Sequence, residues 1–274
     1  MGFFAIPFPV IDPVLVEVGP FAIRWYALAY VAGILFAWWL ARRLVATPTL
    51  WAAGTAPYDA ALIDDAITWI TLGIVLGGRV GYVLFYNLPF YLDHPEAVLR
   101  IWQGGMSFHG GLIGCALGLV FTAWRHGKPL LPLLDIASVV APVGLFFGRI
   151  ANFINGELWG RTTDVAWAMV FPGAGPLPRH PSQLYEAAGE GLLLFVLLLC
   201  AIRLGALKRP GLVAGLFGIG YAAARFLVEF VREPDLQIGL IGGVLSMGQI
   251  LCLPMAALGL ALVLRARRAQ PVKA

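Results

Sequence analysis

Long apolar segments alternate with short polar stretches along most of this chain. A transmembrane helix needs about 20 apolar residues to cross the hydrocarbon core of a bilayer. Segments near that length occupy residues 23–40, 66–86, 107–124, 130–147, 182–203, 212–231 and 244–264. The pattern predicts an all-α polytopic membrane protein with seven transmembrane helices. Ser182 is the expected N-cap of the fifth helix, because its hydroxyl can accept from a free N–H group of the first turn.

Lysine and arginine clusters follow every second apolar segment. Cytoplasmic loops of membrane proteins carry an excess of these residues. The clusters are Arg42 and Arg43; Arg125 and Lys128; Arg203, Lys208 and Arg209; and Arg265, Arg267, Arg268 and Lys273. Their spacing predicts that the N-terminus lies outside and the C-terminus in the cytoplasm.

The composition indicates one membrane-embedded domain over residues 1–274. Hydrophobic residues make up 60% of the chain and charged residues 12%, whereas a soluble domain carries roughly 25% charged residues. The net charge of +4 does not indicate nucleic-acid binding, because the positive charge lies in short clusters beside apolar segments. Residues 1–20 are rich in proline and lack Lys and Arg, which favours an arm at the membrane interface over a cleavable signal peptide.

One polar segment, residues 148–161, follows directly on an apolar segment. Its sequence is GRIANFINGELWGR. Arg149 offers a fork of donors that suits an oxyanion, and Asn152 and Asn155 offer both donors and acceptors. Buried ionisable groups at membrane depth are functional candidates. The alternative is a capped helix end at the membrane surface with ordinary loop polarity.

A second polar group lies on the sixth apolar segment. Tyr221, Arg225, Glu229 and Arg232 recur at helical spacing, so they share one face of the helix. One alternative is an Arg225–Glu229 ion pair that only balances charge. The preferred reading is a site for an anion, with a lipid phosphate as its ligand, to which Arg149 and Arg79 also contribute.

Several isolated residues are further candidates. His109, in SFHGG, has an unperturbed pKa suited to a general base, although a lone histidine is more often a hydrogen-bonded structural residue. Tyr26 lies near the outer end of the first segment, where an interfacial aromatic belt also explains it. Gln183, Tyr185 and Glu186 open the fifth segment and either line the same site or form a polar helix start. No metal-ligand spacing occurs among the histidines and cysteines.

Glycines recur every four residues on the second and third segments, at positions 73, 77 and 81 and at positions 110, 114 and 118. This spacing predicts close helix packing. No internal repeat is visible, which weakens the case for a transporter built from inverted repeats.

Four segments together resemble the bacterial prolipoprotein diacylglyceryl transferase family: SFHGGLIG, GRIANFINGELWGR, RHPSQLYEA and a YxxxRFxxEFxRxPD pattern from Tyr221 to Asp235. The resemblance covers nearly the whole chain in the family's order. It implies an enzyme of the bacterial inner membrane whose site faces the periplasm. Such an enzyme moves the diacylglyceryl group of phosphatidylglycerol onto the lipobox cysteine of a prolipoprotein and releases glycerol phosphate. It implies no metal and no organic cofactor, and a seven-helix body with a periplasmic head at residues 150–181 and an arm at residues 1–20.

The resemblance also implies roles for individual residues. Arg149 and Arg225 would hold the lipid phosphate. Tyr26, Asn152 and Glu157 would orient the headgroup or the reacting centre. The expected headgroup site further includes Asn155, Tyr221 and Glu229. His109 is the candidate base, with Glu229 and Glu157 as alternatives.

Other functions remain as alternatives at this point. A lipid or anion transporter would use the same arginines without chemistry, but the polar groups cluster on the outer side and leave no route inward. A structural membrane protein would use the polar stripes to hold helices together. An intramembrane protease would need a serine or a paired-aspartate site, and none is convincing.

Overall fold

The computed structural model describes residues 6–19, 21–234 and 239–268. Residues 1–5 and 20 of the expected arm lie outside this range, as do Asp235 of the fourth motif and Lys273 of the last basic cluster.

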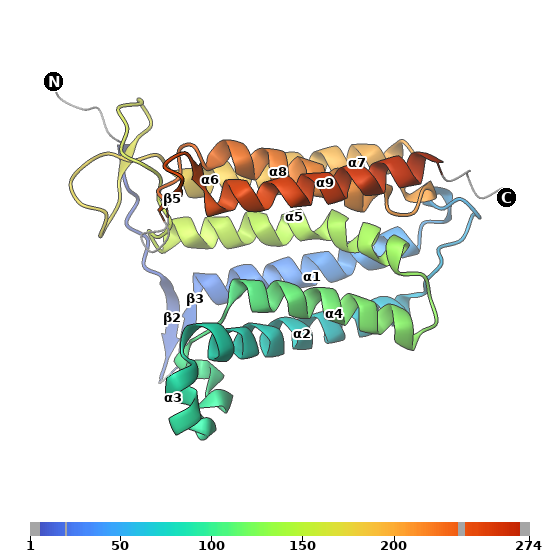
Figure 1. The fold of residues 1–274 in the computed structure, drawn as a ribbon, viewed down its shortest axis with the longest axis horizontal. Helices are drawn as coiled ribbons and strands as arrows, with labels where there is room; N and C mark the ends of the chain where they lie inside the picture. Colours follow the sequence, from blue (N-terminus) through green and yellow to red (C-terminus); the bar gives the residue numbers. More distant parts are fainter. Residues whose placement is uncertain (1–5, 20, 235–238, 269–274) are drawn as a thin grey trace.

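Each of the seven apolar segments forms a helix, and the helices lie side by side along the long axis of the molecule (Figure 1). The helices are α1 (Trp25–Val45), α2 (Ala60–Tyr86), α4 (Phe108–Arg125), α5 (Leu130–Ile154), α8 (Leu212–Val228), α9 (Met247–Arg268) and the run from α6 (Ser182–Glu186) through a π-helical segment (Ala187–Leu193) to α7 (Leu194–Arg203). In Figure 1, α1 and α5 lie between the α2–α4 pair and the helices α6 to α9.

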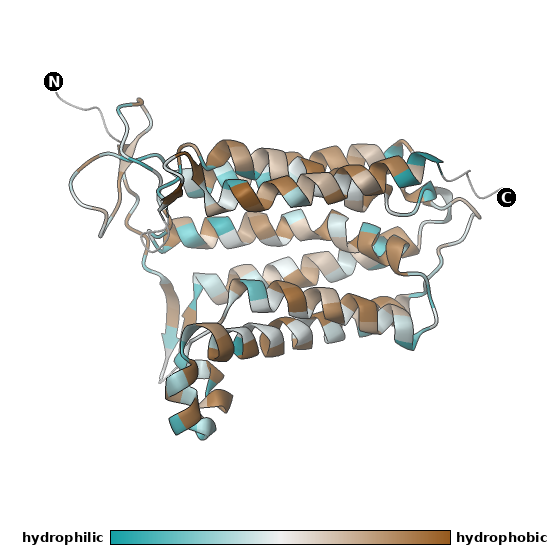
Figure 2. Ribbon diagram, viewed as in Figure 1, coloured by the Kyte–Doolittle hydropathy of each residue, from teal (hydrophilic) through white to brown (hydrophobic). Residues whose placement is uncertain are grey.

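Five of these helices are long and apolar enough to cross a membrane: α1, α2, α5, the Ser182–Arg203 run and α9. This identifies a polytopic membrane protein. The helix α8 is apolar but shorter, and α4 is not among the five. Figure 2 shows hydrophobic residues along the lengths of the helices and more hydrophilic ones in the loops that join them.

Short elements complete the chain. These are β1 (Ile6–Pro7), β2 (Val14–Val18), β3 (Phe21–Arg24), η1 (Pro48–Leu50), α3 (Leu88–Asp93), η2 (Pro95–Leu99), η3 (Ile101–Gln103), β4 (Met169–Val170), η5 (Ala206–Lys208), β5 (Leu240–Ile241) and β6 (Leu245–Ser246). The strand pairs are β1 with β4 in parallel, and β2 with β3 and β5 with β6 antiparallel. The arm is therefore partly a hairpin, and its first strand joins the segment between α5 and α6.

Side chains accept from backbone N–H groups at the starts of α2, α4 and α8. Asp59 accepts from Leu62 N at 2.9 Å at the start of α2, and Ser107 Oγ accepts from Gly110 N at 3.2 Å at the start of α4. The fully buried Asp135 of α5 accepts from two N–H groups at the start of α8, Gly211 at 2.7 Å and Ala214 at 2.8 Å. The expectation that Ser182 caps α6 is wrong, because its hydroxyl donates to Leu158 O at 2.9 Å.

Arg79 of α2 binds the segment between α2 and α4 and does not join the charged cluster at the end of α5. Its guanidinium donates to the carbonyl groups of Ala97, Val98, Gly104 and Gly105 at 2.6–3.0 Å and lies 5.1 Å from the ring centre of Tyr91. The expectation that Arg79 helps bind the anion is therefore wrong. A buried arginine needs acceptors, and here the carbonyl groups of residues 97–105 supply them.

The glycines of α2 and α4 form the seam between these helices, as their spacing predicts. A Cβ on Gly114 would overlap the carbonyl group of Gly73, and a Cβ on Gly110 would overlap that of Gly77. No larger side chain fits, so the glycines set the distance between the helices.

Gly114→Ala should therefore destabilise the protein, because the added methyl group meets backbone that cannot rotate away. We expect the free energy of unfolding to fall by about 1–3 kcal/mol, as in other overpacked cores, measured by thermal unfolding in detergent. Gly144→Ala in α5 is the matched control, because its Cβ would have nothing within 4 Å. Equal midpoints for the two variants would contradict the role of the seam.

Candidate functional site

A cluster of six charged side chains, three buried acids and three partly buried arginines, lies where α5, the Ser182–Arg203 run (hereafter the α6 run) and α8 meet. Its members are Arg149 on α5, Glu186 on α6, Glu190 on the π-helical segment, Arg225 on α8, and Glu229 and Arg232 just after α8. The carboxylates of Glu186 and Glu190 are 0% exposed. The arginine side chains are 11–17% exposed. Three positive and three negative charges balance, so the cluster is formally neutral.

Glu186 is the centre of this cluster. Its Oε1 accepts from Arg225 Nη1 and, at 2.8 Å, from Arg232 Nη1. Arg149 Nε lies 3.1 Å from Glu186 Oε2, at ion-pair distance but without hydrogen-bond alignment. One acid therefore holds arginines from two helices and from the chain that follows α8.

Glu229 connects the cluster to α9. It forms an ion pair with Arg225 one turn earlier, and its Oε2 accepts from Ser246 Oγ at 2.5 Å. Ser246 Oγ also accepts from Gln249 N at 3.1 Å, as an N-cap does. The start of α9 is thus attached to the same acid that orients Arg225.

A second set of side chains surrounds Glu157. Asn152 Nδ2 donates to Glu157 Oε1 at 2.9 Å and to the Tyr26 hydroxyl at 3.2 Å. Asn155 Nδ2 lies 3.4 Å from the same Glu157 oxygen. Because Asn152 follows Arg149 by one turn of α5, this set lies next to the charged cluster. The predicted residues Tyr26, Asn152, Asn155 and Glu157 are brought together.

The end of α5 explains the position of Glu157. Gly156 has φ +66°, and the N–H groups of Gly156 and Glu157 return to Phe153 O at 2.9 Å and Asn152 O at 3.1 Å. This is the Schellman arrangement that ends many helices on a left-handed glycine. It turns Glu157 back onto Asn152.

The next residue, Leu158, has φ 59°, a left-handed conformation that costs a leucine free energy. Its carbonyl group accepts from Ser182 Oγ, and the carbonyl group of Glu157 accepts from Gln183 Nε2 at 2.6 Å. Two residues of the RHPSQLYEA motif therefore hold the turn that carries Glu157.

Two other residues of that motif form a chain of hydrogen bonds at the edge of the site. Trp167 Nε1 donates to the Tyr185 hydroxyl at 2.6 Å, and this hydroxyl lies 3.2 Å from His180 Nδ1. Burial lowers the pKa of His180. This shift disfavours the charged imidazolium, because burial removes the water that would solvate it.

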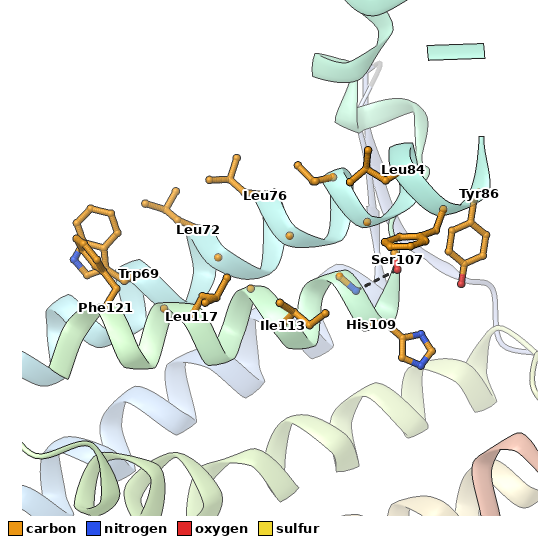
Figure 3. A pocket seen from close by; sticks show the side chains of 18 residues that line it. Trp69, Leu72, Leu76, Leu84, Tyr86, Ser107, His109, Ile113, Leu117 and Phe121 are labelled. Carbon is orange, nitrogen blue, oxygen red and sulfur yellow. Dashed lines mark hydrogen bonds between the residues drawn. The ribbon is translucent and has the colours of Figure 1, made fainter. Parts of the chain in front are cut away.

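His109 lies apart from both sets. It is exposed near the start of α4, with its ring 5.7 Å from that of Phe108. It lines the end of an apolar groove of about 920 Å³ along the α2–α4 seam. Figure 3 shows its ring on the side of α4 away from α2. Within the described residues, no hydrogen bond or ion pair joins His109 to the charged cluster.

Tyr221 lies on α8 one turn before Arg225, and its ring stacks on Phe217 at 5.9 Å. Arg225 and Glu229 do form the ion pair that the sequence offered as the simpler alternative. Arg225 is nevertheless shared with Glu186, so this pair is only part of a larger network.

Sequence reasoning missed Glu190 altogether and left Glu186 between two readings, a residue of the same site or part of a polar helix start. The available signal was a pair of acids four residues apart in an otherwise apolar helix. Such acids are rare in transmembrane segments and normally face a partner of opposite charge.

The chemistry offered by this region is anion binding next to hydrogen-bonding groups. Arginine forks suit phosphate, and a site with little water strengthens such contacts. Across residues 6–19, 21–234 and 239–268, no group of three or more His, Cys, Asp or Glu side chains is placed to hold a metal ion.

Comparison with known proteins identifies the family. The model of the family described as prolipoprotein diacylglyceryl transferase matches residues 13–265. Relatives named phosphatidylglycerol–prolipoprotein diacylglyceryl transferase include one from Methylocella silvestris, 61% identical over 99% of both chains. Another, from Allorhizobium ampelinum, is 59% identical over 97% of this chain and 94% of the relative. A third, from Bradyrhizobium diazoefficiens, is 57% identical over 99% of this chain and 97% of the relative. The chain belongs to the prolipoprotein diacylglyceryl transferase family.

Proposed function

We propose that this protein transfers the diacylglyceryl group of phosphatidylglycerol to the lipobox cysteine of a prolipoprotein and releases glycerol phosphate. The observation that carries the proposal is the convergence of Arg149 and Arg225 on Glu186 in a chain of this family. Two arginine forks, partly exposed beside apolar helices, suit the phosphate of a lipid headgroup. The relatives are named as transferases, which favours this function over a lipid or anion transporter.

The reaction forms a carbon–sulfur bond and breaks a carbon–oxygen bond. The thiol loses its proton, because the thiolate is the nucleophile. The sulfur attacks the glycerol carbon that carries the phosphate, and the phosphate leaves with the bonding electron pair. Arg149 and Arg225 stabilise the negative charge that grows on the leaving oxygen, as fixed donors do in sites with little water.

The set around Glu157 orients the polar part of the lipid. The hydroxyl of Tyr26, the amides of Asn152 and Asn155 and the carboxylate of Glu157 present donors and acceptors at one point. A glycerol headgroup offers hydroxyl groups that match them. Tyr221 and Glu229 complete the headgroup site through Arg225.

His109 is the proposed base for the thiol proton. The alternatives are less suited, because Glu229 already holds Arg225 and Ser246 and Glu157 already accepts from Asn152. The apolar groove along the α2–α4 seam ends at His109, so an apolar substrate segment in that groove would end beside this residue. No metal or organic cofactor takes part in this scheme.

The proposed setting is the bacterial inner membrane. Seven helices would span it, with the N-terminus and the site on the periplasmic side and the C-terminus in the cytoplasm. The positions of α4 and α8 beside the longer helices (Figure 1) and the basic residues in the last turns of α1, α4, α7 and α9 support this topology. The chain forms one domain, with an arm at residues 1–20 and a periplasmic head at residues 150–181.

The transferase is tested by incubating the purified protein with phosphatidylglycerol and a lipobox peptide and then weighing the peptide. We expect a mass gain of one diacylglyceryl group. A peptide with Cys→Ser in the lipobox and the Arg149→Ala enzyme should give no gain. No gain from folded wild-type protein that binds the lipid would favour the transporter.

Arg149→Lys should keep the charge and lose the fork. We expect transfer to slow by about 10²–10³, the effect of losing one fixed donor to a developing negative charge, measured as the initial rate of the peptide assay. Arg100→Lys is the control, because Arg100 is exposed on the external segment between α2 and α4. A rate close to that of wild type for Arg149→Lys would exclude bidentate phosphate binding by Arg149.

His109→Gln should lower kcat by about 10²–10⁴, the usual contribution of a general base, and leave the KM for the lipid nearly unchanged. The comparison variant is His94→Gln, an exposed histidine on the external segment. Unchanged turnover in His109→Gln would remove this residue from the mechanism.

A further inference from the structure

We propose that Glu190 takes up one proton when the anionic headgroup of a phospholipid binds to Arg149 and Arg225. Headgroup binding would then depend on pH. The inference rests on the proposed function, because it concerns the same headgroup site.

The charge balance of the cluster is the first reason. Three partly buried arginines face three buried carboxylates. A phosphodiester with one negative charge would leave the occupied site with a net charge of −1. A buried charge without compensation costs several kcal/mol, and one bound proton restores neutrality.

The bonding of Glu190 is the second reason. Its carboxylate oxygens lie 3.6 Å from Arg149 Nη2 and from Arg225 Nη1, and neither oxygen accepts a hydrogen bond from any described residue. Glu186 and Glu229, in contrast, each accept at least one hydrogen bond. Glu190 is therefore the carboxylate whose negative charge is least stabilised.

A bound phosphate would increase this difference. It would engage the terminal nitrogens of Arg149 and Arg225, which are the partners of Glu190. Glu186 would keep Arg232 at 2.8 Å, and Glu229 would keep Ser246 at 2.5 Å. Once protonated from solvent, Glu190 can donate a charge-assisted hydrogen bond to a phosphate oxygen. No other bond changes in this step.

The backbone places Glu190 at this point. It lies in the π-helical segment Ala187–Leu193, and such segments occur frequently at functional sites. The following residue, Gly191, packs so closely on α5 that a Cβ would lie 2.7 Å from that of Phe146. Because Phe146 precedes Arg149 by one turn, this contact sets Glu190 against Arg149.

The groups that face Glu190 cannot take the proton in its place. They are Arg149 from α5, Glu186 from α6, Tyr221, Arg225 and Glu229 from α8 and its end, Arg232 and, from α9, Cys252. A guanidinium, a phenol and a thiol have no free site for a proton near neutral pH. Glu186 and Glu229 keep their donors when phosphate binds.

The experiment measures proton uptake during binding. Short-chain phosphatidylglycerol is titrated calorimetrically into the full-length protein in detergent, in buffers of different ionisation enthalpy. We expect close to one proton taken up per lipid. The Kd should weaken as pH rises, by up to about tenfold per pH unit, because binding and proton uptake are linked. Short-chain diacylglycerol, which lacks the phosphate, should cause no uptake.

Glu190→Gln should still bind the lipid, without proton uptake and with a Kd that no longer changes with pH. Glu233→Gln is the matched control. Glu233 lies outside the cluster and pairs with Arg179 at 2.9 Å, so its variant should take up the proton as wild type does. Lipid binding by wild type without uptake would refute the proposal, as would undiminished uptake by Glu190→Gln.

A second measurement needs only the wild-type protein. Infrared difference spectra should show a new protonated carboxyl band when phosphatidylglycerol is added. The absence of this band would refute the proposal even if Glu190→Gln does not fold.

The peptide assay on the same preparation separates this inference from the proposed function. Transfer without proton uptake would leave the proposed function intact and remove only this inference, whereas binding and uptake without transfer would refute the proposed function.

Discussion

The cost of placing charge inside an apolar helix bundle is the constraint on which this site depends. Arginines that are proposed to bind a lipid phosphate have to stay charged while no lipid is bound. Glu186, Glu190 and Glu229 make this possible, because their charges offset those of Arg149, Arg225 and Arg232. The network also joins α5, the α6 run, α8 and the start of α9. The groups proposed to bind the ligand are thus also the groups that hold these helices together.

The surrounding backbone positions the side chains of this network and of the neighbouring set around Glu157. The left-handed turn at Gly156 and Leu158 carries Glu157 back to Asn152, and Ser182 and Gln183 hold the turn from the other side. Gly191 lets the π-helical segment lie close to α5. These positions explain why the polar motifs contain residues that have no chemistry of their own.

The apolar segments of the sequence predicted the positions of the helices well, because length and apolar character decide which segments can be buried in lipid. It also predicted the α2–α4 seam from its glycines. Roles of individual charged residues were harder to predict. Arg79 lies within an apolar segment and Arg149 directly after one, yet Arg79 binds backbone carbonyl groups and Arg149 binds acids. Sequence alone does not say which acceptors the fold brings to an arginine. For the same reason, the sequence did not single out Glu190, which becomes significant only beside Arg149 and Arg225.

The contact between Asp135 and the start of α8 has a consequence for how the chain enters the membrane. Gly211 N and Ala214 N lie at the start of α8, where backbone N–H groups have no acceptor within the helix. Their acceptor, Asp135, lies 76 and 79 residues earlier, so the ribosome has already delivered it when α8 emerges. Biogenesis in chain order therefore supplies the cap before the helix that needs it. A circular permutant that begins with α8 would reverse this order and present an uncapped helix to the insertion machinery.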